Sequence, residues 1–124
     1  MVFGIGIDLI EIDRIKNSIE RIGDNFLNKI FTNVEIKYSS SKGFPYQHYA
    51  ARFAAKEAIA KALSTPDNKG FNWHDIEVFN EDNGYPSAVL YGKMKSILGS
   101  DKELKISISH SEKYATCVAI VYYK

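Results

Sequence analysis

The chain has 124 residues, 45% of them hydrophobic and 25% charged, and a formal net charge of +1 at pH 7. This length fits one domain with a sizeable core, and the composition is that of an ordinary folded protein rather than a disordered one. The small net charge argues against a strongly basic nucleic-acid-binding protein.

A single cysteine, Cys117, excludes an internal disulfide and fits a reducing compartment. The sequence has no secretory signal, and no apolar run approaches the ~20 residues that span a bilayer. We therefore expect one domain over residues 1–124, located in the cytoplasm, without membrane insertion and without a nucleic-acid partner.

The first predicted element is a strand over residues 2–11, which is rich in β-branched residues. Alternation along a strand places Gly4, Gly6 and Asp8 on one face and large apolar residues on the other. The glycines indicate close packing by another element, room for a ligand beside the carboxylate, or both. Asp is disfavoured in strands, and a carboxylate among apolar groups needs a compensating partner.

Helices are predicted next. Asp13 can cap a helix over residues 13–21 that Gly23 ends, and a short helical piece over residues 25–31 follows. A capping box that begins at Thr32 predicts another helix start.

The longest predicted helix covers residues 46–63 and is rich in alanine, which favours helix and close backbone packing. Residues 64–70 are predicted as a flexible connection. The remaining predicted elements are a hairpin of residues 76–79 and 87–90, a short helix over 91–98 ended near Gly99, and strands over 104–109 and 116–123.

The long helix carries the candidate chemistry. Helical spacing places Glu57 and Lys61 on one face, which most often marks a surface ion pair. Arg52 and Lys56 are a like-charged pair at the same spacing, which either faces an anion or is solvated. Asp8 and Glu57 could supply oxygens to Mg²⁺, which commonly uses one or two carboxylates plus substrate phosphates.

A second candidate group stands at the end of a predicted strand, where Ser109, His110 and Ser111 follow one another. A single histidine there is more often a structural residue, but the three side chains also offer phosphate-binding donors. Scattered histidines and one cysteine give no zinc spacing, and the sequence lacks a serine-hydrolase elbow and a dinucleotide fingerprint.

Several motifs occur in an order that resembles bacterial holo-acyl-carrier-protein synthases, in the 4′-phosphopantetheinyl transferase superfamily. The matching segments are Gly4–Ile15, Arg52–Ala58 with Lys61-Ala62, Asp75–Val78, Asn83-Gly84-x-Pro86, and Ser107–Ser111 with Tyr114-Ala115. Each motif is weak alone, but their joint order covers nearly the whole chain.

The resemblance implies an enzyme that transfers 4′-phosphopantetheine from coenzyme A to a serine of apo-acyl carrier protein, releasing adenosine 3′,5′-bisphosphate. It implies an α+β fold, with a small antiparallel sheet packed on a long central helix, and a homotrimer that binds coenzyme A at subunit interfaces. Two alternatives are a non-catalytic coenzyme A or nucleotide-binding module and a structural oligomer with Asp8 and Glu57 in buried ion pairs.

The resemblance also assigns roles to residues. Asp8 and Glu57 match the metal ligands, and with Lys61, near the coenzyme A diphosphate, they form the expected catalytic group. The residues expected to contact coenzyme A are Arg52, Lys61, Ser109, His110 and Ser111. Arg14 is expected to meet the acidic carrier protein. The base for the serine proton is Glu57, directly or through a metal-bound water, or a water held by Asp8.

Three departures from the family pattern are expected to matter. Ala51 stands where glycine is common, and Thr116-Cys117 replaces two alanines; both are expected to adjust packing. Ser64-Thr65-Pro66 replaces a glycine-rich turn, and this puts the local loop geometry in question.

Overall fold

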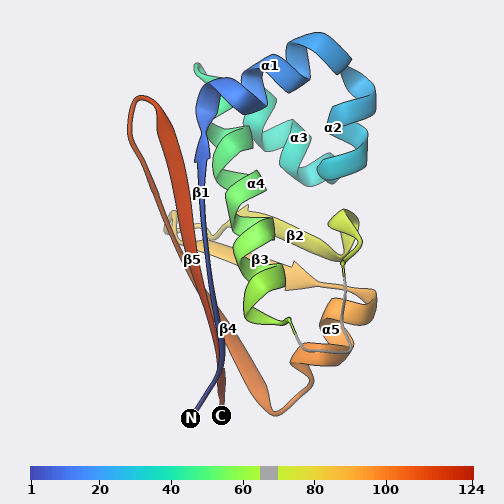
Figure 1. Cartoon of the computed structure of the whole chain (residues 1–124), viewed down its shortest axis with the longest axis vertical. Coiled ribbons are helices and arrows are strands. Elements are labelled where there is room, and N and C mark those ends of the chain that lie inside the picture. The colour runs from blue at the N-terminus through green and yellow to red at the C-terminus, as the bar shows by residue number, and fades with distance from the viewer. Residues whose placement is uncertain (65–69) are drawn as a thin grey trace.

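The structure is a computed structural model that describes residues 1–64 and 70–124. Its main sheet has three antiparallel strands in the order β1 (Val2–Glu11), β5 (Tyr114–Tyr123) and β4 (Lys102–His110). A separate hairpin pairs β2 (Ile76–Asn80) with β3 (Pro86–Leu90). The long helix α4 (Pro45–Ala62) lies along the main sheet and contacts β1 and β5 most extensively (Figure 1). The predicted α+β class, with a small antiparallel sheet on a central helix, is confirmed.

Three short helices gather at one end of α4: α1 (Ile12–Ile22), α2 (Asp24–Ile30) and α3 (Asn33–Ser40) (Figure 1). The helix α5 (Gly92–Leu98) lies toward the other end, and the 3-10 turn η1 (Trp73–Asp75) contacts both α2 and α5. The predicted ends at Gly23 and Gly99 are confirmed, because both glycines cap their helices with positive φ.

Of the two predicted helix N-caps, the one at Thr32 is confirmed and the one at Asp13 is wrong. The capping box at Thr32 is confirmed: the Thr32 amide donates to Glu35 Oε1 at 2.8 Å, and the Glu35 amide donates to Thr32 Oγ1 at 3.4 Å. Asp13 as the cap of α1 is wrong, because Glu11 is the N-cap, without a side-chain bond, and Asp13 lies inside the first turn. The predicted connection over residues 64–70 lies, for residues 65–69, outside the described residues.

The glycines of β1 explain how closely α4 approaches the sheet. A Cβ atom at Gly4 would collide with the carbonyl oxygen of Ala62, and one at Gly6 with that of Ala58. The predicted close packing is confirmed, and the helix backbone occupies the space beside both glycines. This contact brings the last turns of α4 against the strand that carries Asp8.

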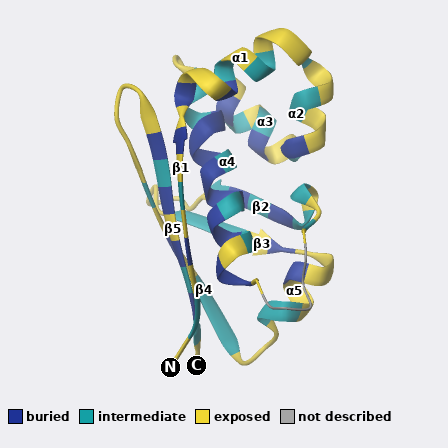
Figure 2. Cartoon of the chain, viewed as in Figure 1, coloured by how far each residue is buried: buried dark blue, intermediate teal, exposed yellow. Residues whose placement is uncertain are grey.

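The two faces of the sheet differ in burial. The face under α4 is buried, and α4 itself is buried along most of its length (Figure 2). On the opposite face, Ile5 and Ile7 are each 62% exposed and Leu9 is 65% exposed. Val118, whose register partner is Ile7, is also exposed. This apolar strip has no cover within the described part of the chain.

Among the helices that the structure describes, none combines the length and the apolar character needed to cross a membrane.

Candidate functional site

The first cluster joins β1 to the last turn of α4. The Lys61 ammonium donates to the Ile7 carbonyl oxygen at 3.0 Å and lies 3.4 Å from Asp8 Oδ1. The Asp8 side chain is 19% exposed and that of Lys61 is 54% exposed, so solvent reaches the pair. The ion pair that Lys61 makes within the described residues is therefore with Asp8, rather than the pair with Glu57 that helical spacing suggested.

Glu57 is half-buried beside the same pair. Burial raises the pKa of Glu57, the nearby Asp8 carboxylate raises it further, and Lys61 opposes both effects. Two carboxylates that repel each other next to an ammonium form a site that gains from an added cation or proton. The structure thus brings Asp8, Glu57 and Lys61 together, as the sequence analysis expected.

The donor set of this cluster suits Mg²⁺. Its carboxylate oxygens are hard ligands, and Mg²⁺ is commonly held by one or two carboxylates while water and substrate phosphates complete its shell. Within residues 1–64 and 70–124, no group of three or more His, Cys, Asp or Glu side chains is placed to hold a metal alone. Asp8 and Glu57 would therefore supply part of the ligand shell of the ion, and water and substrate phosphates would supply the rest.

Two residues of β5 fix the strand that carries Asp8. The Thr116 hydroxyl donates to the Asp8 backbone oxygen at 2.7 Å. Cys117 lies opposite Asp8 in the register and is fully buried, which raises the pKa of its thiol to about 12. The two residues that replace the usual alanines thus support packing, and Cys117 is no nucleophile at neutral pH.

The second cluster surrounds a hollow of about 210 Å³ on another side of α4. Arg52 and His110, both predicted coenzyme A contacts, line this hollow together with Ala51, whose methyl group stands where glycine was expected. The other lining residues are Tyr38, His48, Asn80, Gly84, Pro86 and Ile108.

Arg52 is held in place but has spare hydrogen-bonding capacity. It is 3% exposed, its Nη2 donates to Asn80 Oδ1 at 2.7 Å, and its guanidinium lies 4.0 Å from the centre of the Tyr38 ring. Its Nε has no partner within the described residues. A buried donor without a partner is costly, so this geometry favours an anionic or acceptor ligand in the hollow.

Lys56 does not share this environment. Its ammonium lies 2.7 Å from Glu35 Oε1, and both side chains are fully buried. Both interpretations of Arg52 and Lys56 as a like-charged pair, solvated or facing one anion, are wrong, because Lys56 has a protein carboxylate and Arg52 has Asn80 and Tyr38. The sequence did not reveal this because Glu35 is distant along the chain.

The predicted strand-end donors are only partly brought together. His110 lines the hollow with Ile108, and Gln47 Nε2 lies 2.6 Å from its Nδ1. Ser109 and Ser111 are exposed and do not line the hollow, and Ser111 Oγ accepts from the Tyr114 amide at 3.2 Å in the β4–β5 turn. Arg14 is exposed on α1, apart from both clusters.

The two clusters belong to different edges of the sheet. Asp8 is on β1 and His110 is on β4, and β5 separates these strands. Helix α4 contributes Glu57 and Lys61 to the first cluster and Arg52 to the second. One chain thus presents two separate partial sites.

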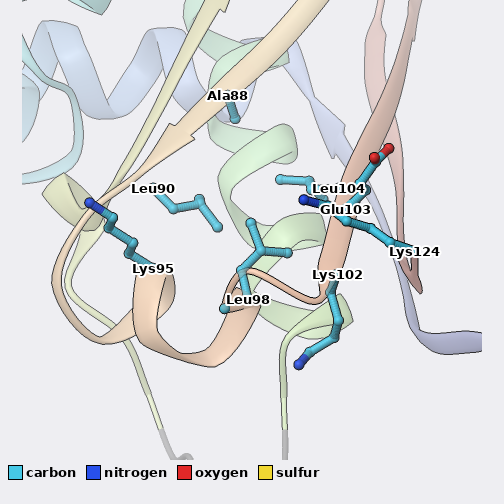
Figure 3. Close-up of a pocket in the computed structure, with 9 residues that line it drawn as sticks. Ala88, Leu90, Lys95, Leu98, Lys102, Glu103, Leu104 and Lys124 are labelled. Atoms are coloured by element: carbon cyan, nitrogen blue, oxygen red, sulfur yellow. The ribbon is translucent and has the colours of Figure 1, made fainter.

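A larger hollow, of about 470 Å³, lies between β3, α5 and β4 (Figure 3). Leu90, Leu98 and Leu104 point into it, and Lys95, Lys102 and Lys124 stand around it. None of the predicted site residues lines this hollow, so its size does not identify it as the reaction site.

Sequence reasoning missed three residues of the second cluster: Tyr38, His48 and Asn80. Asn80 stands just before the predicted turn of the hairpin, which was the available signal for it. His48 stands one helical turn before Arg52, and this spacing was the available signal for it, whereas Tyr38 carries no local pattern because only the packing of α3 against α4 brings it to the hollow.

Comparison with known proteins gives a consistent result. The model of the 4′-phosphopantetheinyl transferase superfamily matches residues 4–119. A holo-[acyl-carrier-protein] synthase of Chlamydia trachomatis serovar L2 is 50% identical over 119 residues, 96% of this chain and 98% of its own length. One of Koribacter versatilis is 44% identical over 124 residues, 98% of each chain.

Solved structures of holo-acyl-carrier-protein synthases have the same fold as this chain. The complex of the Chronobacterium ammoniagenes synthase with coenzyme A is similar at a TM-score of 0.84 and 30% identity, covering 97% of this chain and 96% of that one. The Helicobacter pylori holo-[acyl-carrier-protein] synthase in complex with coenzyme A has a TM-score of 0.80 and 29% identity, covering 95% and 99%.

Proposed function

The chain belongs to the 4′-phosphopantetheinyl transferase superfamily, and we propose that Asp8, Glu57 and Lys61 carry out its reaction. Its activity is that of a holo-[acyl-carrier-protein] synthase. It transfers the 4′-phosphopantetheine group of coenzyme A to a serine of apo-acyl carrier protein, and adenosine 3′,5′-bisphosphate is the other product. This activity is favoured over a non-catalytic binding module.

The proposal rests on one observation: the carboxylates of Asp8 and Glu57 and the ammonium of Lys61 lie together at a solvent-accessible surface. Transfer from a diphosphate requires that negative charge on the phosphate oxygens be neutralised. Lys61 would donate hydrogen bonds to these oxygens, and Asp8 and Glu57 would hold Mg²⁺. When bound, Mg²⁺ supplies charge neutralisation and orientation of the diphosphate.

The serine nucleophile comes from the carrier protein, and its proton needs a base. Glu57, acting directly or through a metal-bound water, is the leading candidate, because its half-buried carboxylate lies beside Asp8 and Lys61 at the proposed site of transfer. A water held by Asp8 is the competing base.

The second cluster takes the nucleotide end of coenzyme A. Arg52 and His110 bind its phosphate, and Ser109 and Ser111 are further candidate donors. Because one chain holds its two partial sites at different sheet edges, we propose a homotrimer in which the first cluster of one subunit meets the second cluster of its neighbour. The exposed strip of Ile5, Ile7, Leu9 and Val118 supports burial between subunits.

Arg14 on the exposed side of α1 is proposed to meet the acidic carrier protein, and the proposed location is the cytoplasm.

A transfer assay tests the function. Apo-acyl carrier protein is incubated with the chain, coenzyme A and Mg²⁺, and intact mass is measured. We expect a gain of one phosphopantetheine mass and the release of adenosine 3′,5′-bisphosphate. No gain with several apo-carriers and a folded enzyme would reject the function, and coenzyme A binding without product would indicate the binding module.

A further inference from the structure

Three basic side chains contact one tyrosine, Tyr38, at the second cluster, and a fourth, His110, lines the same hollow. Arg52 lies 4.0 Å and the Lys42 ammonium 4.4 Å from the centre of the Tyr38 ring. The His48 ring meets the same tyrosine edge-on, with centroids 5.7 Å apart. His48 and His110 line the hollow with Arg52, so α3, the loop after it, α4 and β4 each contribute to the group.

No member of this group is in an ion pair within the described residues, although the Glu35 carboxylate, which pairs with Lys56, also acts on Arg52. The ion pairs found in residues 1–64 and 70–124 are Lys56–Glu35, Lys61–Asp8 and Lys102–Asp101, and none includes a member of the group. Arg52 is only 3% exposed, and its Nε has no hydrogen-bond partner within the described residues. A hollow lined by basic side chains without ion-pair partners, with an unused buried donor, is suited to a phosphate.

We propose that His48 is a further binding residue for a phosphate of coenzyme A, and that its protonation on binding makes the affinity for coenzyme A rise as the pH falls. This proposal rests on the proposed function and concerns the nucleotide end of the same substrate. In the sequence His48 stands one helical turn before Arg52, and its contact with Tyr38 and its place in the lining of the hollow assign it.

The direction of the pH effect follows from the charges that face His48. Burial lowers the pKa of His48, and the positive charges of Arg52, Lys42 and His110 act in the same direction. The histidine is therefore predominantly neutral near pH 7 in the free protein. A bound phosphate brings negative charge that favours the imidazolium, so binding takes up a proton and strengthens as the pH falls.

Calorimetric titration with coenzyme A tests this, using wild type, His48→Gln and a control, His74→Gln, whose exposed histidine lies on η1. Each is titrated between about pH 8 and pH 6.5 in two buffers of different ionisation enthalpy, which gives the number of protons taken up. For one proton the dissociation constant falls by up to about tenfold per pH unit. The titration of the ligand's own phosphate, near pH 6, is common to all three proteins.

We expect wild type and His74→Gln to take up protons and His48→Gln to take up measurably fewer, with a weaker pH dependence of its affinity. In NMR, the His48 ring resonance, identified by its loss in His48→Gln, should titrate at higher pH with adenosine 3′,5′-bisphosphate bound. Equal proton uptake by His48→Gln and wild type, with both binding coenzyme A, would overturn the role of His48 alone. No binding by folded wild type would instead overturn the proposed function.

Discussion

Helix α4 carries the lysines of two lysine–carboxylate pairs, which differ in distance and in burial. Lys56 and Glu35 lie 2.7 Å apart and are both fully buried, whereas Lys61 and Asp8 lie 3.4 Å apart and are reached by solvent. Two lysines of one helix thus pair with carboxylates of different elements, Glu35 of α3 and Asp8 of β1, in different environments.

The buried pair has its hydrogen bonds satisfied. The Lys56 ammonium also donates to the carbonyl oxygens of Ile30 and Trp73, each at 2.9 Å. Glu35 accepts from the Thr32 amide at 2.8 Å and from the Val78 amide at 2.7 Å. The pair joins α2, α3, α4, η1 and β2, and it leaves nothing for a ligand to bind.

The exposed pair is incomplete. Within the described residues, the oxygen partners of Lys61 are the Ile7 carbonyl and, at a longer distance, Asp8 Oδ1, and Glu57 lies beside them with a raised pKa. The buried Lys56–Glu35 pair, with all its hydrogen bonds made within the protein, stabilises the fold. The accessible Lys61–Asp8 pair, beside a second carboxylate, is available to bind substrate. Four experiments test this difference.

The largest expected effect is on stability at the buried pair. Lys56→Met leaves the Glu35 carboxylate buried without its cation, and we expect a loss of about 3–5 kcal/mol in the free energy of unfolding. Urea denaturation followed by circular dichroism measures it. A loss below about 1 kcal/mol would show that the Lys56–Glu35 pair does not stabilise the fold.

The next effect is on catalysis at the exposed cluster. Asp8→Asn and Glu57→Gln remove charge from the proposed metal site, and each should lower the transfer rate by about 10²–10³-fold, as for loss of one preorganised electrostatic contact. The thermal midpoint should stay near that of wild type. Either variant with full activity would reject its assignment as a metal ligand.

Ligand binding should stabilise the protein through the exposed cluster. Coenzyme A with Mg²⁺ at about 100 times its dissociation constant should add about 2.7 kcal/mol to the free energy of unfolding. A thermal-shift measurement should show the gain in wild type and a smaller gain in Asp8→Asn. An equal gain in both proteins would place the metal elsewhere.

The smallest expected effect is on stability at the exposed pair. Lys61→Met makes the same chemical change as Lys56→Met, but we expect less than about 1 kcal/mol, because the Lys61–Asp8 pair is solvated. Urea denaturation beside Lys56→Met gives the matched comparison, and the transfer rate should fall. A stability loss as large as that of Lys56→Met would remove the distinction between the pairs.

The sequence predicted the first cluster well. Asp8 stood out as a carboxylate in a strand, and Glu57 and Lys61 stood out by helical spacing within a family motif. The strand over residues 2–11 and the capping box at Thr32 were also predictable, because alternation and capping depend on residues that are neighbours in the chain.

Tertiary structure decided the partners. Glu35 for Lys56, Asn80 and Tyr38 for Arg52, and Asp8 for Lys61 are contacts between different elements. Local spacing does not specify these contacts, so the prediction that Arg52 and Lys56 act as a like-charged pair was wrong.

The sequence by itself determined the elements, the α+β class and the three residues of the first cluster, because these follow from short-range periodicity and motif order. Only the packing of α3 and β2 against α4 decided that Lys56 is structural, that Arg52 keeps a free buried donor and that His48 faces the same hollow. The physical reason is that burial and charge compensation are set by groups distant in sequence, which meet only when the helix settles onto Gly4 and Gly6 of the sheet.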